Sequence, residues 1–181
     1  MKVLVDEDRF LALIEAHKRI LYKVANAYCK NRADRQDLIQ DVIIQLWRSF
    51  GRFDDRCQFS TWMYRIAMNV AISFYRNESR RTRNTVPIEE FGLEMAAADQ
   101  LMDQASDDIR LLQRLINQLD ELNRALIILY LDGYGHEAIA EIVGISVTNV
   151  ATRISRIKQK LKREFDGAYY DPNRRSADES R

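Results

Sequence analysis

The sequence predicts an all-α protein made of two small helical domains that are joined by a flexible acidic linker. Apolar side chains recur at intervals of three and four, as they do along one face of an α-helix. Only 2 prolines and 6 glycines interrupt the 181 residues, and no segment alternates as a strand would. The predicted parts are an N-terminal domain, a linker, a C-terminal domain and a polar tail, at residues 1–83, 84–106, 107–166 and 167–181.

The net charge of +1 conceals an uneven distribution along the chain. Residues 1–83 carry 16 Lys or Arg and 10 Asp or Glu, a net charge of +6. Residues 84–108 carry seven acidic residues and no basic ones, and residues 109–165 return to +3. Two basic domains suit a nucleic-acid-binding protein, because Lys and Arg neutralise phosphates.

Several classes of protein are disfavoured. The longest apolar runs, such as residues 126–131, are too short to cross a bilayer, and the N-terminus has no basic-then-apolar signal pattern. We therefore expect a cytoplasmic protein without membrane insertion. The two cysteines and two histidines form no cluster at metal-ligand spacing, and the sequence contains no glycine-rich phosphate loop or nucleophile–base pattern. No metal site, cofactor or catalytic activity is expected.

Three helices are expected in the N-terminal domain. An apolar stripe marks the first, over residues 10–28. The second begins near Asp34, whose side chain suits an N-cap. Ser60 or Thr61 caps the third, which runs to about Ser79.

The C-terminal domain contains a helix-turn-helix pattern at residues 136–146. Ala140 lets two crossing helices approach closely, Gly144 suits a left-handed turn, and Ser146 can cap the next helix. That helix carries a net charge of +5 over residues 150–165. The pattern favours DNA binding; a helical hairpin with a solvated basic face is the alternative.

The second helix of such a motif lies in the major groove. Polar side chains near its start reach base edges, Arg153 can pair with guanine through two hydrogen bonds, and basic residues further along neutralise phosphates. The expected DNA contacts are Ser146, Thr148, Asn149, Thr152, Arg153, Arg156 and Lys158.

Three segments carry a family resemblance. Residues 37–48 (DLIQDVIIQLWR) resemble the part of bacterial sigma factors that grips the clamp coiled coil of the largest polymerase subunit. Residues 59–71 (FSTWMYRIAMNVA) resemble the next part, which melts the promoter and holds single-stranded DNA. Residues 125–161 resemble the domain that reads the minus-thirty-five element. A linker of only about 25 residues makes the chain similar to the small extracytoplasmic-function group.

The resemblance implies a non-enzymatic initiation factor that directs core RNA polymerase to promoters. Its expected partners are the clamp coiled coil and the flap of the polymerase, promoter DNA and an anti-sigma factor. The expected polymerase contacts are Asp37, Gln40, Asp41, Gln45, Leu46, Trp47 and Arg48. Burial in the core is the alternative for Leu46 and Trp47, and capping or solvation is the alternative for the acidic and amide residues.

For the single strand, the resemblance implies contacts from Phe59, Asn69, Arg76, Arg80 and Arg81. Phe59, the loop before it and Asn69 are expected to form a pocket for a flipped base of the minus-ten element. The apolar residues spaced by four on this helix are expected in the core; these are Trp62, Ile66, Val70 and Phe74. The acidic linker is expected either in the channel for nascent RNA or as a solvated tether.

One departure from the family is the sequence Asn149-Val150-Ala151, where such proteins often have Thr-Val-Lys. It leaves the identity of the upstream contacts open. A rival interpretation is a regulator that dimerises through residues 1–81 and binds a palindrome. A recombinase would need a nucleophile supported by arginines, which Tyr130 and Tyr134 lack in the sequence.

Overall fold

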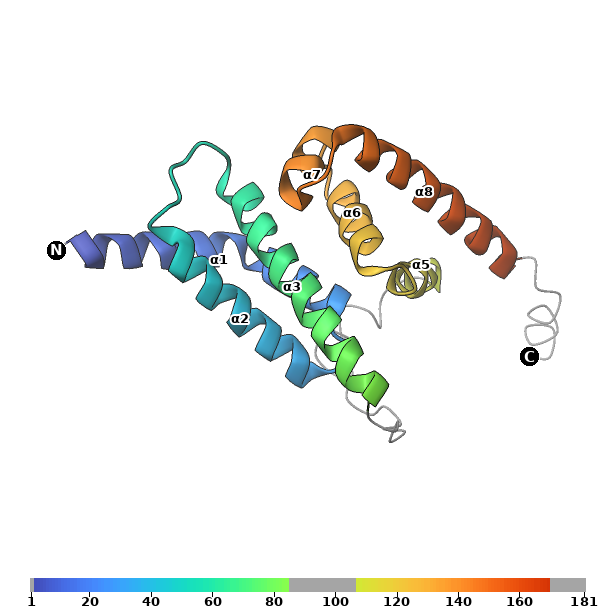
Figure 1. Ribbon diagram of the computed structural model, residues 1–181, viewed down its shortest axis with the longest axis horizontal. Helices are drawn as coiled ribbons and strands as arrows, with labels where there is room; N and C mark the ends of the chain where they lie inside the picture. The colour runs from blue at the N-terminus through green and yellow to red at the C-terminus, as the bar shows by residue number, and fades with distance from the viewer. Residues whose placement is uncertain (1, 85–106, 170–181) are drawn as a thin grey trace.

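The computed structural model describes residues 2–84 and 107–169, which form α-helices and contain no strand (Figure 1). The all-α prediction is therefore confirmed. The helices are α1 (Lys2–Tyr28), α2 (Arg32–Phe50), α3 (Phe59–Asn84), α5 (Asp107–Asn117), α6 (Glu121–Leu131), α7 (His136–Val143) and α8 (Val147–Tyr169). The acidic linker and most of the predicted tail lie outside the described residues.

Helices α1, α2 and α3 pack against one another as an N-terminal bundle. Its core includes one row of α2, where Leu38, Val42 and Leu46 are fully or almost fully buried. Met63 of α3 and Val24 of α1 are buried with them. Each such side chain contributes roughly 1.5–3 kcal/mol by leaving water, so this row holds α2 in place and turns its other face outward.

Two helix starts differ from the prediction. The N-cap of α2 is Asn31, whose side-chain oxygen accepts a hydrogen bond from the Asp34 backbone nitrogen at 2.8 Å. Asp34 therefore lies in the first turn, where its charge favours the helix N-terminus. Helix α3 begins at Phe59, one residue before Ser60, and the predicted caps Ser60 and Thr61 lie inside it.

The C-terminal domain follows the predicted helix-turn-helix closely. Helix α7 ends at Val143 and is capped by Gly144, which has φ +76° and ψ +36°, the left-handed conformation that disfavours a Cβ. The Asn149 backbone nitrogen donates to Ser146 Oγ at 3.3 Å, so Ser146 caps α8. Helix α6 begins at Glu121, because the side chain of its N-cap, Asp120, accepts a hydrogen bond from the Asn123 backbone nitrogen at 2.8 Å.

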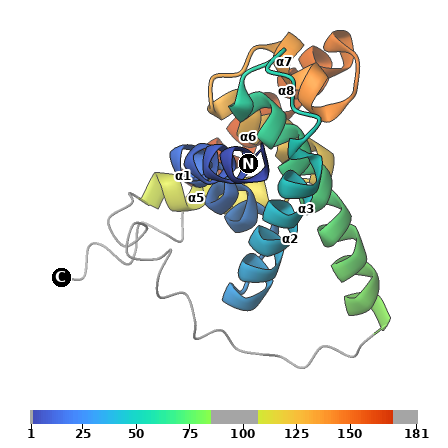
Figure 2. The same cartoon turned by 90° about the vertical axis from the view of Figure 1, so that its left-hand side faces the viewer.

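The two domains touch, because α3 packs against α6 and α7 (Figure 2). Arg124 of α6 is only 4% exposed, and its guanidinium lies 5.4 Å from the ring centre of Tyr28 and 5.0 Å from that of Tyr75. It donates hydrogen bonds to three backbone carbonyls, those of Ala27, Asn117 and Leu119. The Tyr28 hydroxyl donates to the Glu121 carbonyl at 2.6 Å, and burial raises the pKa of Tyr28.

A second contact between the domains centres on Asp132, just after α6. Its carboxylate accepts hydrogen bonds from the Tyr64 hydroxyl of α3 and from Lys23 Nζ of α1. The Tyr64 ring also meets the Tyr134 ring edge-on, with centres 5.4 Å apart. Burial, and then the bond to Asp132, raise the pKa of Tyr64, which therefore remains protonated and donating. No helix within the described part of the chain is long and apolar enough to span a membrane.

Candidate polymerase and nucleic-acid interfaces

The exposed face of α2 combines apolar and charged side chains. Trp47 is 44% exposed, and its ring meets Phe10 edge-on with centres 5.0 Å apart. Ile44 is 47% exposed, one turn before Trp47, and was not among the residues predicted from the sequence. The predicted polar contacts are also exposed on α2; these are Asp37, Gln40, Asp41, Gln45 and Arg48. The face offers a partner an apolar centre within a polar rim.

Leu46 does not belong to that face. Its side chain is fully buried, which supports the core alternative and corrects its inclusion among the direct polymerase contacts. Leu46 continues the buried row of Leu38 and Val42 at intervals of four. Trp47, the next residue along the helix, lies on the neighbouring face and is exposed to solvent.

A groove of about 400 Å³ runs between α2 and α3. It is lined by Asp41, Gln45, Ile66, Asn69, Val70, Ser73, Phe74 and Asn77. Two residues predicted to bind polymerase therefore share a groove with Asn69, which was predicted to hold a base. The Asn69 amide is exposed there and offers both a donor and an acceptor.

Phe59 lies elsewhere. Phe59 is 7% exposed and packs within an aromatic cluster. The centre of its ring lies 5.3 Å from that of His17, 5.5 Å from that of Phe53 and 5.4 Å from that of Trp62. The structure therefore does not bring Phe59 and Asn69 into one groove. The row predicted for the core is only partly buried: Trp62 is half-buried in this cluster, and Ile66, Val70 and Phe74 line the groove. The buried row of α3 is Met63, Ala67 and Ala71 instead.

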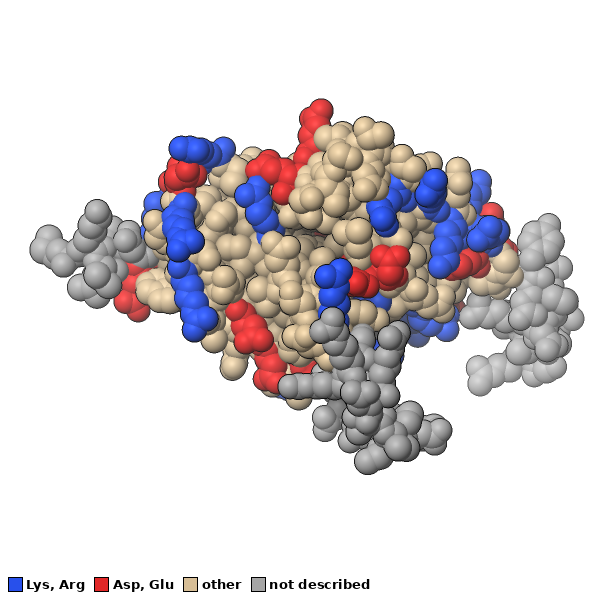
Figure 3. Space-filling view, viewed as in Figure 1, with Lys and Arg blue, Asp and Glu red and all other residues tan. Residues whose placement is uncertain are grey.

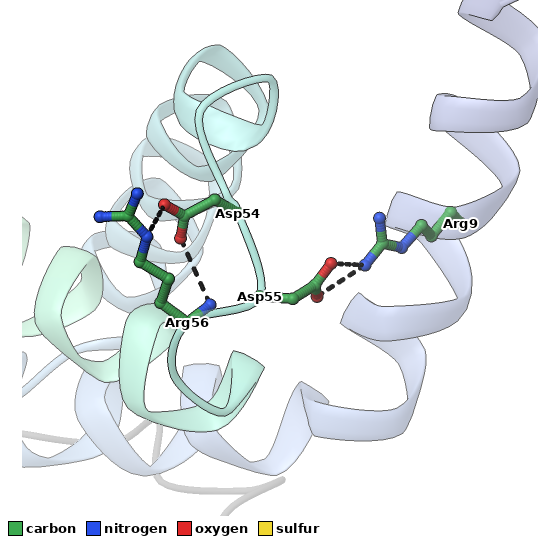
Figure 4. Close-up of polar contacts among 4 residues, drawn as sticks. All are labelled: Arg9, Asp54, Asp55 and Arg56. Atoms are coloured by element: carbon green, nitrogen blue, oxygen red, sulfur yellow. Dashed lines mark hydrogen bonds and ion pairs between the residues drawn. The ribbon is translucent and has the colours of Figure 1, made fainter.

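The loop before α3 is held by two carboxylates (Figure 4). Asp55 has a positive φ of 58°, which is uncommon for a residue other than glycine. Arg9 Nη2 donates to both Asp55 carboxylate oxygens, at 2.7 and 2.8 Å. Asp54 pairs with Arg56 Nε at 2.9 Å and accepts a hydrogen bond from the Arg56 backbone nitrogen. The loop thus has a defined shape beside Phe59.

Of the arginines predicted to contact single-stranded DNA, Arg76 is exposed and forms an ion pair with Glu121 of α6 at 2.9 Å. This hydrogen-bonded guanidinium holds the pKa of the Glu121 carboxyl below its usual range. Arg80 and Arg81 lie in the last turns of α3, where the described structure covers the backbone alone.

A second groove, of about 290 Å³, follows the first half of α8. It is lined by Leu119, Asp120, Asn123, Asn149, Thr152, Arg153, Arg156, Ile157 and Lys160. Arg153 Nε donates to Asn149 Oδ1 at 2.9 Å, and Arg153 Nη1 donates to Asn123 Oδ1 at 3.3 Å. Basic side chains gather over α8 at the right of Figure 3. Arg153 is therefore pre-positioned beside polar groups that can also meet base edges.

Lys158 is separated from this group. Its Nζ donates to the Tyr130 hydroxyl at 3.2 Å and lies 5.2 Å from the centre of that ring, against α6. Lys160 and Asn123 line the groove instead, although neither was predicted. A helical wheel of α8 could have indicated Lys160, since it lies one turn beyond Arg156; Asn123 comes from another helix.

Replacement of Arg153 by alanine is expected to relax sequence preference in the upstream element. A guanidinium that reads a base contributes roughly 1–3 kcal/mol of discrimination, whereas a phosphate contact weakens binding to every sequence. The measurement is transcription by the holoenzyme from promoters with each base of the upstream element varied in turn. Lys158→Ala, which removes a similar charge away from the groove, is the matched control. An equal loss on all promoters would contradict base reading by Arg153.

These surfaces belong to a two-domain helical protein with one candidate protein-docking face and two candidate nucleic-acid-binding surfaces. Sequence comparison gives the family: Sigma-70 region 2 matches residues 13–81, and Sigma-70, region 4 matches residues 109–161. The chain belongs to the sigma-70 family and is a sigma factor of the extracytoplasmic-function type.

Similar curated proteins extend over most of the chain. The ECF RNA polymerase sigma factor SigW of Bacillus subtilis is 28% identical over 171 residues, 88% of this chain and 90% of that protein. The ECF RNA polymerase sigma-E factor of Escherichia coli is 28% identical over 167 residues, 86% of each chain.

Two solved structures share the fold. RpoE of Bartonella quintana, in complex with the anti-sigma factor NepR, matches with a TM-score of 0.66 and 23% identity over 91% of this chain and 97% of that chain. CnrH, in complex with the cytosolic domain of CnrY, matches with a TM-score of 0.64 and 23% identity over 89% and 90% of the two chains.

Proposed function

We propose that this sigma factor binds core RNA polymerase through the exposed face of α2 and directs it to promoters that α3 and α8 recognise. The observation that carries the proposal is the pairing of Ile44 and Trp47, both nearly half exposed, among charged residues on an otherwise well-packed helix. Large apolar side chains surrounded by a polar rim are typical of the centre of a protein interface. In this proposal the chain is a non-catalytic specificity subunit.

The two DNA-binding surfaces divide the promoter between them. The N-terminal half of α8, with the groove around Arg153, reads the minus-thirty-five element as duplex DNA. The groove around Asn69, together with the basic end of α3, holds the melted minus-ten strand.

We further propose control by an anti-sigma factor. The two solved structures with the same fold are complexes, one with the anti-sigma factor NepR and one with CnrY. An anti-sigma factor that covers the exposed face of α2 would compete directly with polymerase, because both would need Ile44 and Trp47.

Run-off transcription on genomic fragments with core polymerase tests the proposal. We expect start sites that share upstream elements, and capture of the chain by core polymerase in a pull-down. The free chain is expected to bind promoter duplex weakly. If the chain fails to bind polymerase but binds palindromic duplexes tightly, the stand-alone regulator is correct and the proposal is wrong.

Asn69→Ala is expected to impair promoter opening while leaving polymerase binding intact, because the amide lies in the groove and outside the apolar centre of the α2 face. Extruding a base costs a few kcal/mol, which a fitted pocket offsets, so a loss of open complexes on the order of tenfold is expected. Permanganate footprinting on linear templates measures the melted strand. Asn26→Ala, which removes the same side chain from an exposed site on α1 outside the groove, is the control. Unchanged melting in Asn69→Ala would refute the pocket role.

A further inference from the structure

The guanidinium of Arg153 is held by side chains from two helices. Its Nε donates to Asn149 Oδ1 of α8 at 2.9 Å, and its Nη1 donates to Asn123 Oδ1 of α6 at 3.3 Å. Arg153 and Asn123 are both half-buried, whereas Arg156, one turn further along α8, is exposed. The bond to Asn149 stays within one helix. The bond to Asn123 therefore fixes the guanidinium relative to a second helix.

The orientation of the Asn123 amide decides whether that second bond can form. One end of the amide accepts hydrogen bonds and the other donates them, and only the oxygen can accept from a guanidinium. Asp120, the N-cap of α6, accepts from the Asn123 backbone nitrogen at 2.8 Å and, through its other oxygen, from Asn123 Nδ2 at 2.5 Å. An ionised carboxylate only accepts, so Nδ2 must face Asp120. The amide oxygen is thereby turned toward Arg153.

A guanidinium that is held in this way suits the recognition of a base. An arginine side chain loses rotational freedom when it becomes fixed on DNA, and this cost is smaller if the side chain is already ordered. Pairing with guanine through two hydrogen bonds also requires a particular plane of the guanidinium. Within the described residues, the bonds to Asn149 and Asn123 use Nε and Nη1 and leave Nη2 for a base edge.

We propose that Asn123, oriented by Asp120, is a positioning residue for recognition of the upstream promoter element. It holds Arg153 in the plane that pairing with a base of that element requires, and it acts through Arg153 without touching DNA. The proposal rests on the proposed function, in which the groove around Arg153 reads the minus-thirty-five element. Specificity then depends on the first turn of α6, which lies outside the two helices of the helix-turn-helix.

Base discrimination by the full chain with core polymerase tests the proposal. The measured quantity is run-off transcription from a promoter with its mapped upstream element, divided by that from each single-base variant of the element. Arg153→Ala identifies the base that Arg153 reads. Asn123→Ala should lower the ratio at that base about fivefold and leave the other ratios unchanged, because the ordering of one side chain is lost. Asn117→Ala, the same truncation at an exposed site outside the groove, is the matched control.

A double variant distinguishes positioning from direct contact. If Asn123 acts only through Arg153, then Asn123→Ala adds no further loss of discrimination to Arg153→Ala. A further loss in the double variant would show that Asn123 binds DNA itself, and the proposal would be wrong.

Asp120→Asn tests the orientation of the amide without truncating Asn123. Asparagine caps a helix about as well as aspartate, so α6 should keep its start. The new amide nitrogen, however, is a donor facing Asn123 Nδ2, which turns the Asn123 amide over and directs a donor at Arg153. We expect the same loss at the same base. Removal of a carboxylate from the groove strengthens binding to every sequence alike, so it cancels in the ratio.

The free chain gives a readout that needs neither promoter nor polymerase. In nuclear magnetic resonance spectra of the ¹⁵N-labelled chain, the Arg153 Nε–H signal should be resolved and slow to exchange with water. It should lose that protection in Asn123→Ala and in Asp120→Asn, while Asn117→Ala keeps it. Protection that is unchanged in the first two variants would contradict positioning by Asn123.

The possible results separate the positioning role from the proposed function. Full discrimination by Asn123→Ala would overturn the positioning role and leave the proposed function intact. An equal loss at every base, with a lower midpoint of thermal unfolding, would overturn it in favour of a purely structural link between α6 and α8. If the unsubstituted chain supports no transcription with core polymerase, the proposed function is wrong and the positioning role in promoter recognition is wrong with it.

Discussion

Replacement of Arg124 by alanine is expected to lower the free energy of unfolding of the C-terminal domain by about 3 kcal/mol. The substitution leaves the buried Leu119 carbonyl and the partly buried Asn117 carbonyl without this donor, and each bond to a charged group contributes roughly 1.5–3 kcal/mol. It also removes the cation that lies over the Tyr28 and Tyr75 rings. The lost free energy of unfolding has two sources, the hydrogen bonds within the C-terminal domain and the contact between the two domains.

Urea denaturation separates the two contributions. Far-UV circular dichroism reports both domains, whereas tryptophan fluorescence reports the N-terminal domain, because both tryptophans of the chain, Trp47 and Trp62, lie there. Arg124→Lys keeps the charge but lacks the planar guanidinium that donates to several carbonyls at once. Roughly half of the loss in the free energy of unfolding should therefore remain. Arg156→Ala, on the exposed side of α8, should stay within about 0.5 kcal/mol of the unsubstituted chain. If Arg124→Ala is as mild as Arg156→Ala, the anchoring role is wrong.

Trp47→Ala is expected to weaken binding to core RNA polymerase about 30-fold, or about 2 kcal/mol, as loss of an aromatic residue at an interface centre does. Ile44→Ala should add a smaller loss, because Ile44 lies one turn away on the same exposed face. Fluorescence anisotropy of labelled chain titrated with core polymerase measures both. Neither side chain is fully buried, so circular dichroism should show the bundle intact.

Leu11→Ala is the matched control for this prediction. Leu11 is an apolar side chain of α1 that is 56% exposed, more than either Ile44 or Trp47, and it lies on another helix. Removing it takes away exposed apolar surface without altering α2. If Trp47→Ala binds core polymerase with the same affinity as Leu11→Ala, the α2 face is not the docking surface.

The helices and the helix-turn-helix were predictable because each helix has a continuous apolar stripe of its own. Helix starts were less predictable, since Asn31 and Asp34 are equally good N-caps and only the path of the chain decides between them. The burial of Leu46 had a signal in its spacing from Leu38 and Val42, which marks one row of a helix. Leu46 was nevertheless predicted to contact polymerase, because its segment resembles the polymerase-binding part of the family.

The contact between the domains was not predicted, although the sequence contains a sign of it. Residues 124–129 of α6 are all buried, and a helix that is buried on every side needs partners on more than one face. A one-dimensional pattern does not say which partners these are. Asn123 joined the α8 groove, and Phe59 separated from Asn69, for the same reason: each depends on how whole helices pack.

The ion pair of Arg9 with Asp55 has a consequence for exchanging the loop before α3 between related proteins. The loop at residues 54–58 is tied to α1 by a guanidinium 46 positions away in sequence, which pairs with Asp55 at its positive φ. A chimera that receives only these five residues would carry their side chains but would lack the Arg9 contact to Asp55. Transplanting the loop in this shape requires an arginine at the matching site of the recipient's first helix, so the unit to transplant is discontinuous in sequence.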